Sequence, residues 1–399
     1  MSSQPDTRRV ICFLNPIGRI GGAERSLLDL IGALPDERYR KVLIAPYEGP
    51  LTEEMRALGG KVHIVPYPDS LLKAGRNAPW RVVVMALFAP FLLVPLLCRI
   101  GRILRAEKAD ILHANGVKPH FISALLAPFV SVSIVWHWRD FSAKRAIWPL
   151  YRWLARRVPK RIIAVSEAVA AELRPHLRNV VVVYNGMNIA KYQSAGRPAR
   201  EDHDDFLVGI CGILTPWKGH EVLLEAVARL KERGSKLRVW VVGDEIYDTA
   251  GHGNWRDHLE DMSRKLGVED TVEFLGYRKD MPAILQRLDV LVQPSTQPET
   301  FGRTVAEGLA AGCAVVLSRI GGMPEIARHE QEGLQVEPGN AEELAEAIER
   351  YRQDPALRKR LAEAGQRRIE EHFSLAATSR QVMELYDTLA PPAPVSADA

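Results

Sequence analysis

Cysteine and aromatic residues are scarce in this sequence, and the two shortages limit what kind of protein it encodes. The 399 residues include 4 cysteines, and Phe, Trp and Tyr together make up 7% of the chain. Cys12, Cys98, Cys211 and Cys313 lie far apart, and no two of them form a CxxC pair. Scattered thiols of this kind are typical of buried, unpaired cysteines in a reducing compartment. We therefore expect a cytoplasmic protein whose cysteines are buried thiols.

The sequence also lacks a recognisable secretion signal and a clear membrane span. The opening stretch MSSQPDTRRV has no apolar core, and the closing stretch LAPPAPVSADA is typical of a disordered tail. Residues 82–98 form a run of 17 uncharged residues, which is near the lower length limit for a spanning helix and is interrupted by Pro90 and Pro95. We expect a helix here that is either buried in the core or lies at a membrane surface.

Acidic residues are scarce in the first half of the chain. Residues 1–200 hold 30 Lys and Arg against 14 Asp and Glu, so 23 and 35 of the totals of 53 and 49 remain for residues 201–399. The first half therefore has a formal charge of +16 and the second half −12. A basic half attracts a membrane surface, a phosphorylated ligand or nucleic acid.

Short apolar runs alternate with helical patterns from one end of the chain to the other. This alternation is typical of parallel sheets covered by helices on both faces. The pattern pauses at a polar stretch near residues 190–204 and then starts again, which predicts an α/β protein of two doubly wound domains. Ligands of such sheets bind beyond the carboxyl ends of the strands. The expected strands lie at residues 8–16, 41–46, 61–67, 110–115, 133–138, 161–166, 206–213, 237–244, 271–277, 289–295, 314–318 and 333–338.

Two loops at expected strand ends have features of anion-binding sites. Gly21 and Gly22 precede a helical pattern, and their small size lets backbone N–H groups approach an anion. Lys218 lies at a helix start beside Gly219, where its ammonium group can hold a phosphate. Neither signal is specific, because glycine turns precede many helices without a ligand and a lysine usually faces solvent. The GxxxxGK[ST] spacing of a nucleotide-hydrolysing loop is missing.

A pair of glutamates in the stretch PETFGRTVAEG is more specific. We expect a helix that opens near Thr300 or Phe301, with Glu299 at its edge and Glu307 two turns later, about 12 Å along the axis. One alternative is that Glu299 complements the helix dipole and Glu307 is a solvated surface residue. Against it, Glu307 precedes the small, apolar GLAAG, where an unpaired carboxylate is costly unless it binds a donor such as a sugar hydroxyl.

Several motifs in a fixed order resemble the retaining glycosyltransferases of family four. They are GGAERSLL, DILHAN, PWKGHEVLLEA, the Glu-x7-Glu pair, LAAGCAVVLSRIGGMPEI, EGLQVEPGN and HFSLAATSRQVMELY, and they span about residues 9–388. The resemblance implies a GT-B fold, in which two Rossmann-like domains face each other across a cleft. Residues 1–195 would bind the acceptor, residues 205–375 the nucleotide-sugar, and a helix at 376–390 would cross back to the first domain.

The resemblance also implies roles for single residues. Glu307 would accept hydrogen bonds from ribose, and Glu299 from the transferred sugar. His137 would contribute a hydrogen bond to the sugar or acceptor rather than act as a base, although a histidine at a strand end is otherwise most often a satisfied, half-buried residue. No metal is implied, and the histidines show no ligand spacing. The implied site comprises catalytic His137 and Glu299, and donor-binding Gly21, Gly22, Gly212, Lys218, Glu299, Phe301, Gly302, Arg303 and Glu307.

Two positions depart from the family pattern. Many relatives have an arginine where this chain has Ile213, so one cation near the diphosphate is missing, and Arg303 is a candidate replacement. Some relatives have a second histidine where this chain has Asn115, which still forms hydrogen bonds but is not protonated near neutral pH. Neither departure removes the two glutamates or Lys218, so we expect an active enzyme with an unusual donor pocket.

The expected activity is transfer of a hexose from a UDP- or GDP-sugar to a lipid-linked or glycan acceptor. Such a reaction belongs to the synthesis of cell-envelope polysaccharide, lipopolysaccharide included, or of glycolipid, and it needs no cofactor beyond the nucleotide-sugar. Two other classes stay open. A nucleotide-sugar epimerase shares the two-domain architecture, and a non-catalytic scaffold at a membrane would explain the missing arginine.

A basic and aromatic segment suggests where the acceptor is met. Residues 139–161 hold eight Lys and Arg against one acid, among Trp148, Tyr151, Trp153 and Leu154. This mixture suits the headgroup region of an anionic membrane, and predicts a peripheral protein on the inner face of the cell membrane. A solvated basic helix is the alternative, while nucleic acid is disfavoured because no recognition motif is present. The acceptor or membrane face would comprise Asn115, Arg139, Arg152, Arg156 and Arg157.

Overall fold

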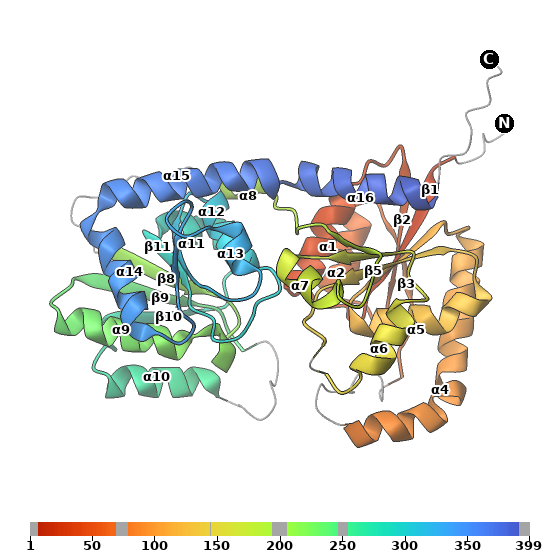
Figure 1. Ribbon diagram of the computed structural model, residues 1–399, viewed down its shortest axis with the longest axis horizontal. Helices are drawn as coiled ribbons and strands as arrows, with labels where there is room; N and C mark the ends of the chain where they lie inside the picture. The colour runs from red at the N-terminus through yellow and green to blue at the C-terminus, as the bar shows by residue number, and fades with distance from the viewer. Residues whose placement is uncertain (1–6, 69–78, 144, 194–205, 246–253, 391–399) are drawn as a thin grey trace, which may run out of the picture. The chain divides into compact units, whose positions relative to one another are not determined.

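The computed structural model describes residues 7–68, 79–143, 145–193, 206–245 and 254–390, with residues 79–92 as backbone only. The chain divides into two compact units (Figure 1). The first unit comprises Met1–Gly186 and Leu375–Ala399, and the second comprises Met187–Ser374. Each unit is built around one parallel sheet.

The first unit contains a sheet of seven parallel strands in the order β3-β2-β1-β4-β5-β6-β7. All six residues of β1 are buried, as expected for a central strand that is covered on both faces. The chain runs outward from β1 to β3 and then returns to the other side of β1, so the strand order reverses between β1 and β4. The strands are β1 (Arg9–Leu14), β2 (Tyr39–Ala45), β3 (Lys61–Ile64), β4 (Ile111–Asn115), β5 (Ser133–Trp138), β6 (Arg161–Ala164) and β7 (Val180–Val182).

Helices from both ends of the chain cover this sheet. The C-terminal helix α16 (Leu375–Leu389) lies beside α1 (Gly22–Ala33) (Figure 1) and contributes Val382, Leu385 and Tyr386 to the core of the first unit. The core therefore includes side chains that lie more than half the chain apart. Among the described residues, the other helices of this unit are α2 (Pro50–Ala57), α4 (Pro79–Ala106), α5 (Val117–Leu126), η1 (Ala127–Phe129), α6 (Trp148–Ala155) and α7 (Glu167–Leu173).

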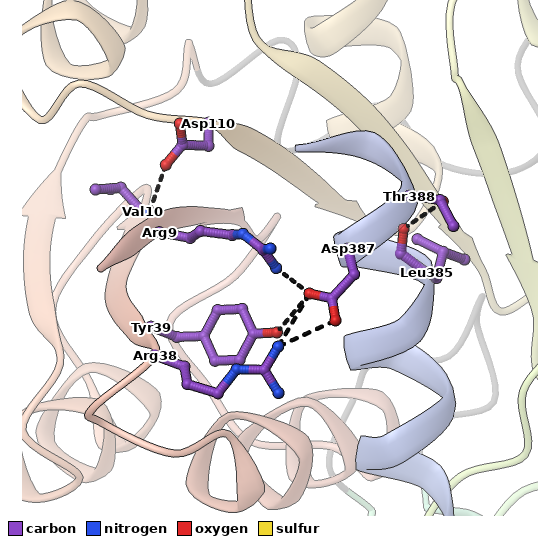
Figure 2. A network of polar contacts seen from close by, with 8 residues as sticks. All are labelled: Arg9, Val10, Arg38, Tyr39, Asp110, Leu385, Asp387 and Thr388. Atoms are coloured by element: carbon purple, nitrogen blue, oxygen red, sulfur yellow. Dashed lines mark hydrogen bonds and ion pairs between the residues drawn. The ribbon is translucent and has the colours of Figure 1, made fainter. Parts of the chain in front are cut away.

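A polar cluster fixes the end of α16 to the first two strands. Figure 2 shows Arg9, Arg38 and Tyr39 around the carboxylate of Asp387. Arg38 Nη2 lies 3.0 Å from Oδ2, the Tyr39 hydroxyl donates to Oδ1 at 3.4 Å, and Arg9 forms an ion pair with Oδ1. Burial alone would raise the pKa of Asp387, but the hydrogen bonds from Arg9 and Arg38 outweigh it and lower that pKa. Asp387 is therefore charged at neutral pH and holds the helix in place.

The second unit contains a sheet of six parallel strands in the order β10-β9-β8-β11-β12-β13, which reverses between β8 and β11. Its core packs strand side chains against α9 and α14. The strands are β8 (Phe206–Cys211), β9 (Leu237–Val242), β10 (Val272–Gly276), β11 (Val290–Gln293), β12 (Ala314–Ser318) and β13 (Leu334–Val336). The helices are α8 (Ile189–Gln193), η2 (Pro216–Lys218), α9 (His220–Glu232), α10 (Trp255–Lys265), α11 (Met281–Arg287), α12 (Arg303–Ala310), α13 (Met323–Ile326), α14 (Ala341–Gln353) and α15 (Pro355–His372).

The fold class predicted from the sequence is confirmed, and every expected strand is present. The short edge strand β7 is an addition to the six strands expected in the first sheet. The polar stretch 190–204 begins inside α8, and its residues from 194 onward lie outside the described residues. The cysteine prediction is correct for Cys12, Cys211 and Cys313, which are buried, and wrong for Cys98, which is exposed.

The uncharged run 82–98 lies within α4, which continues through Pro90 and Pro95. Leu96 is 4% exposed and Val94 is 52% exposed, so the end of the run has one side in the core and one side in solvent. The side chains up to residue 92 lie outside the description. Among the described residues, no helix has the length and apolar character needed to cross a membrane.

Candidate functional site

In the first unit, polar residues gather at the carboxyl ends of three neighbouring strands. Asn15 follows β1, Asn115 ends β4, and His137 is the last residue but one of β5. The strand register pairs Asn115 with His137. Since the order of the sheet reverses between β1 and β4, these residues lie at the switch point where ligands of doubly wound sheets bind.

Arg139 joins these residues into one network. Its Nε donates to Asn115 Oδ1 at 2.6 Å, and its Nη1 donates to Asn185 Oδ1 at 2.8 Å. Asn115 Nδ2 in turn donates to Asn15 Oδ1 at 2.7 Å. The structure thus brings together two residues predicted for the acceptor face, Asn115 and Arg139, and adds Asn15 and Asn185, which sequence reasoning missed.

His137 lies at the buried end of this network. Its Nδ1 is 3.0 Å from His113 Nε2 and 3.4 Å from Arg139 Nη2, while its Nε2 is buried and has no hydrogen-bond partner among the described residues. Burial, with Arg139 nearby, holds the pKa of His137 well below its ordinary value of 6.5. The ring is therefore neutral over the physiological pH range, which suits a hydrogen-bonding role and not a charged one.

In the glycine turn before α1, a backbone N–H is already hydrogen-bonded to a side chain. Gly21 caps the helix, and its N–H donates to Glu24 Oε2 at 3.1 Å. This contact is one half of a capping box, and the spacing of Gly21 and Glu24 was a visible signal for it. The Gly21 N–H that we expected to face an anion is thus engaged by a buried carboxylate. A Cβ on Gly22, in contrast, would meet no atom within 4 Å.

In the second unit, Lys218 and Glu299 meet at the switch point between β8 and β11. Lys218 Nζ lies 2.6 Å from Glu299 Oε1, and each side chain is 17% exposed. The hydroxyl of Ser295 donates to the same oxygen at 2.7 Å, and Gln293 Nε2 lies 3.4 Å from it. A Cβ on Gly212 would lie 3.9 Å from Lys218 Cε, so the predicted donor residues Gly212, Lys218 and Glu299 are neighbours.

Two glycines hold the loops that carry this pair. Gly219, at φ +78°, approaches the chain so closely that a Cβ would lie 1.9 Å from the carbonyl oxygen of Pro294. Gly321 has φ +65°, and a Cβ on it would lie 2.3 Å from the carbonyl oxygen of Glu299. Side chains are excluded at both positions, since φ is positive and the space is filled by backbone. The glycines in RIGGMPEI were a visible signal for this second contact.

The helix after Glu299 begins later than expected. We predicted a start near Thr300 or Phe301, but α12 begins at Arg303 because Gly302 has φ +102°, outside the helical range. Phe301 packs instead into the core, with its ring 5.9 Å from that of Phe373. Glu299 is therefore a loop residue, and the two glutamates do not share one helix.

Glu307 has partners within its own unit. Arg303 Nε donates to Glu307 Oε1 at 2.8 Å, and each side chain is 16% exposed. Tyr192 of α8 contacts both residues, and burial together with the charge of Glu307 raises the pKa of its phenol well above the ordinary value. We expected the Glu307 carboxylate to need a donor such as a sugar hydroxyl, but Arg303 supplies a donor, so the burial of Glu307 does not by itself require a ligand. The spacing of four residues was a visible signal for this ion pair.

Two family models match this chain. The model described as Glycosyltransferase Family 4 matches residues 20–191, and the one described as Glycosyl transferases group 1 matches residues 195–368. Together they span most of the sequence. The chain belongs to the group 1 glycosyltransferases. The family resemblance inferred from the motifs is confirmed, and the protein is an enzyme, a glycosyltransferase of the GT-B fold.

Individual glycosyltransferases are similar to it at moderate identity. An uncharacterised glycosyltransferase of Methanocaldococcus jannaschii is 28% identical over 309 residues, which are 71% of this chain and 76% of the relative. The lipopolysaccharide core biosynthesis glycosyltransferase LpsD of Rhizobium meliloti is 30% identical over 232 residues, 57% of this chain and 63% of that protein. Among solved structures, Anabaena HepE in complex with UDP has a TM-score of 0.79 and 25% identity, covering 95% of this chain and 99% of that chain.

The basic segment of this glycosyltransferase is only partly exposed. Arg156 Nε donates to the carbonyl oxygen of His176 at 2.9 Å, and the guanidinium of Arg157 lies 4.5 Å from the ring of Trp153. Trp153 is 51% exposed, but Trp148 and Tyr151, which we expected at a membrane surface, are buried. Their rings pack with Trp138 and His120 between α6 and the sheet, which explains the difference.

Within the ranges that the structure describes, no three His, Cys, Asp or Glu side chains lie close enough to hold a metal ion together. The metal-independent reaction stays a prediction.

Proposed function

We propose that this glycosyltransferase moves a hexose from a UDP- or GDP-sugar to a lipid-linked or glycan acceptor during the synthesis of cell-envelope polysaccharide or glycolipid. The pairing of Lys218 with Glu299 at the switch point is the observation on which the proposal depends most. It joins a cation suited to a diphosphate with a carboxylate suited to sugar hydroxyls. The complexes of HepE with UDP, with UDP and glucose, and with UDP-glucose support a nucleotide-sugar donor.

Lys218 stabilises the leaving group in this proposal. The nucleoside diphosphate gains negative charge as the glycosidic bond breaks, and donors already in position lower the barrier. Backbone N–H groups at Phe301, Gly302 and Arg303 precede or begin α12, where the helix dipole favours an anion. Ile213 supplies no cation, and Lys218 and Arg303 are each paired with a glutamate, so these two residues are the candidate positive charges for the diphosphate.

Glu299 and Glu307 bind the two sugars of the donor. Glu299 accepts hydrogen bonds from hydroxyls of the transferred hexose, while Ser295 and Gln293 hold its carboxylate in position. Glu307 accepts hydrogen bonds from the ribose, and its ion pair with Arg303 fixes the orientation of the carboxylate. Neither glutamate acts as a nucleophile.

The transfer proceeds with retention of configuration. The acceptor hydroxyl attacks the anomeric carbon from the face that the leaving group departs from, and its oxygen forms the new C–O bond. The bond to the diphosphate breaks, the electron pair leaves with the phosphate oxygen, and that oxygen takes the proton of the hydroxyl. His137 supplies a hydrogen bond to the sugar or acceptor, and no metal is required.

A membrane surface is the proposed place of reaction, on the inner face of the cell membrane. Exposed large apolar side chains of the first unit lie on elements that pack on one another, from the end of α4 through α5 and η1 to α6. Exposed arginines of α4 and of the turn that follows α6 accompany them, and such a mixture of basic and apolar groups suits a headgroup boundary. The apolar residues are Val94, Leu125, Phe129, Leu150 and Trp153, and the arginines are Arg99, Arg102, Arg105, Arg156 and Arg157.

A panel of radiolabelled nucleotide-sugars with a lipid extract tests the proposal, with Lys218→Ala as the inactive control. We expect label to move into the lipid fraction from a UDP- or GDP-hexose, with the anomeric configuration unchanged by NMR. Chelator should leave the rate intact. Release of an epimeric sugar would support the epimerase alternative, and no turnover with any donor would support a scaffold. Either result would overturn the proposed transfer.

A further inference from the structure

Three side chains of the first unit form a continuous line of hydrogen bonds that ends at His137. The hydroxyl of Tyr386 on α16 lies 2.7 Å from His113 Nδ1, and His113 Nε2 lies 3.0 Å from His137 Nδ1. Tyr386 and His113 are 0% exposed and His137 is 4% exposed. Solvent therefore does not supply or remove protons freely along this line.

The direction of the hydrogen bonds follows from Arg139. A guanidinium only donates, and Arg139 Nη2 lies 3.4 Å from His137 Nδ1, so this long contact favours that nitrogen as an acceptor. His113 Nε2 then carries the proton that it shares with His137 Nδ1. A neutral His113 has a bare Nδ1, and this nitrogen accepts from the Tyr386 hydroxyl. In this arrangement every donor in the line faces an acceptor. In the reverse arrangement the Nδ1–H of His137 would face an N–H of Arg139, so two donors would meet.

This direction leaves the proton of neutral His137 on Nε2. That nitrogen is buried and has no hydrogen-bond partner among the described residues. A buried donor without a partner is destabilising, so its presence indicates that an oxygen of a ligand accepts from it. His137 Nε2 is thus the end of the line that can contact a ligand, and the Tyr386 hydroxyl is the end that the fold holds in place.

We propose that the C-terminal helix, acting through Tyr386 and His113, reinforces the tautomer of His137 that Arg139 favours, so that His137 presents an Nε2–H donor to an oxygen of the sugar or acceptor. Tyr386 and His113 are positioning residues, since they act through His137. The identity of the ligand oxygen rests on the proposed function, whereas the tautomer does not.

The anchoring of α16 makes Tyr386 a stable end for this line. The neighbouring Asp387 is held by Arg9 and Arg38 (Figure 2). The ring of Tyr39 lies 6.1 Å from that of Tyr386 in an edge arrangement, and the Tyr39 hydroxyl donates to Asp387. Tyr39 is therefore a matched control, because it touches Tyr386 and the same helix but takes no part in the line to His137.

Nitrogen NMR of the full chain, labelled with ¹⁵N-histidine, tests the tautomer without any substrate. His137→Gln identifies the His137 signals. We expect wild-type His137 to show a protonated Nε2 and a bare Nδ1. Tyr386→Phe removes the donor to His113 Nδ1, so the proton of neutral His113 moves from Nε2 to Nδ1 in part of the molecules. His113 then no longer donates to His137 Nδ1, and the population of His137 with a protonated Nε2 falls. Tyr39→Phe should leave the His137 signals unchanged.

Two results would overturn the tautomer claim. One is a wild-type His137 that is protonated at Nδ1 or charged at neutral pH. The other is a Tyr386→Phe spectrum that matches wild type at His137. Because no donor or acceptor is present, neither result depends on whether the enzyme transfers a hexose.

Kinetics then test whether the tautomer matters for transfer. We expect Tyr386→Phe to lower kcat about tenfold with the KM of the donor unchanged, because the loss falls on a hydrogen bond made at the reacting sugar or acceptor. His113→Gln keeps an N–H toward His137 and should retain more activity than His113→Leu, at equal thermal stability. A shifted tautomer with unchanged kcat, or equal loss in both His113 variants, would overturn the link to catalysis.

Discussion

Lys218 and Glu299 share a hydrogen-bonded contact of 2.6 Å although 81 residues separate them in the sequence. Both side chains are mostly buried, so the contact is screened less than a surface ion pair. The partners come from the loops that follow β8 and β11, the two strands at the reversal of the second sheet. A ligand that reaches this point meets a cation and a carboxylate already in fixed positions.

The first prediction separates the roles of this pair. Lys218→Ala should weaken binding of the free nucleoside diphosphate about tenfold or more, because a hydrogen bond to a charged group contributes ~1.5–3 kcal/mol. Glu299→Ala should leave that affinity unchanged or slightly raised, since Lys218 is released from its partner, while kcat/KM for transfer falls strongly. Calorimetry with the nucleotide and kinetics with the nucleotide-sugar measure the two effects.

The double variant is the control for this first prediction. Lys218 and Glu299 are in contact, so the two effects on protein stability should be non-additive by ~0.5–3 kcal/mol. Glu299→Gln keeps the shape of the side chain and distinguishes loss of charge from loss of packing. If both single variants weaken the bare nucleotide equally, the separate roles for sugar and diphosphate are wrong.

The second prediction concerns Glu307 and Arg303. Glu307→Ala should weaken nucleotide binding by ~1–3 kcal/mol, because the ribose hydroxyls lose their acceptor. Arg303→Ala should have a smaller effect of the same sign, since it leaves the carboxylate in place but without its fixed orientation. Calorimetry with UDP and with the free base uracil measures whether the loss depends on the ribose. An affinity for UDP that is unchanged in Glu307→Ala excludes the ribose contact.

The strands of this fold were predictable from local sequence. Most central strands are short and largely apolar, as expected for parallel strands that are covered by helices on both faces, so neighbouring residues reveal the burial pattern. The start of α12 was missed because one backbone angle decided it. Gly302 adopts φ +102°, and the identity of a glycine alone does not reveal which conformation it takes.

The sequence indicated candidate residues for the site but not the contacts among them. Glu299, Lys218 and His137 were found by family motifs that lie at strand ends. Tyr386 was missed, because it reaches His113 across 273 residues of sequence and no local spacing encodes that distance. Pairs at short spacing, such as Arg303 with Glu307, were visible and were not used.

The third prediction is a loss of stability in weak acid. Burial lowers the pKa of His113 and of His120 to about 3 and lowers that of His137 as well, from an ordinary 6.5. Their contribution is complete above pH 6.5, where both states are neutral. It is lost as pH falls toward 3, because the unfolded chain binds protons that the native chain does not, with a slope of ~1.4 kcal/mol per pH unit for each histidine.

Urea unfolding between pH 6.5 and 5 checks this third prediction, since most carboxylates titrate at lower pH. Burial also lowers the pKa of His220 to about 4, so four histidines contribute to the slope. His120→Gln removes one of the four and should reduce the slope by about a quarter once the unfolded histidines are protonated. A wild-type free energy of unfolding that is flat over this range contradicts the prediction.

The last prediction is that the first unit binds anionic membranes. Arg152, Arg156 and Arg157 lie on or beside α6, near exposed Leu150 and Trp153. Basic residues near an anionic surface contribute ~1 kcal/mol each, so replacing all three with glutamate should abolish sedimentation with anionic liposomes at moderate salt. Nucleotide affinity in the second unit should not change. Trp153→Ala in the otherwise wild-type protein should weaken the binding that remains at high salt, because the apolar contact of Trp153 persists after the charges are screened.

A matched charge reversal in the second unit decides whether position or net charge matters. Lys236, Lys265 and Lys359 are exposed, and their replacement with glutamate changes the net charge by the same amount as the triple variant of α6. We expect this control to sediment with liposomes like wild type. Equal loss of binding in both triple variants would show a general electrostatic attraction without a docking face. Wild-type protein that fails to bind such liposomes would favour a soluble acceptor.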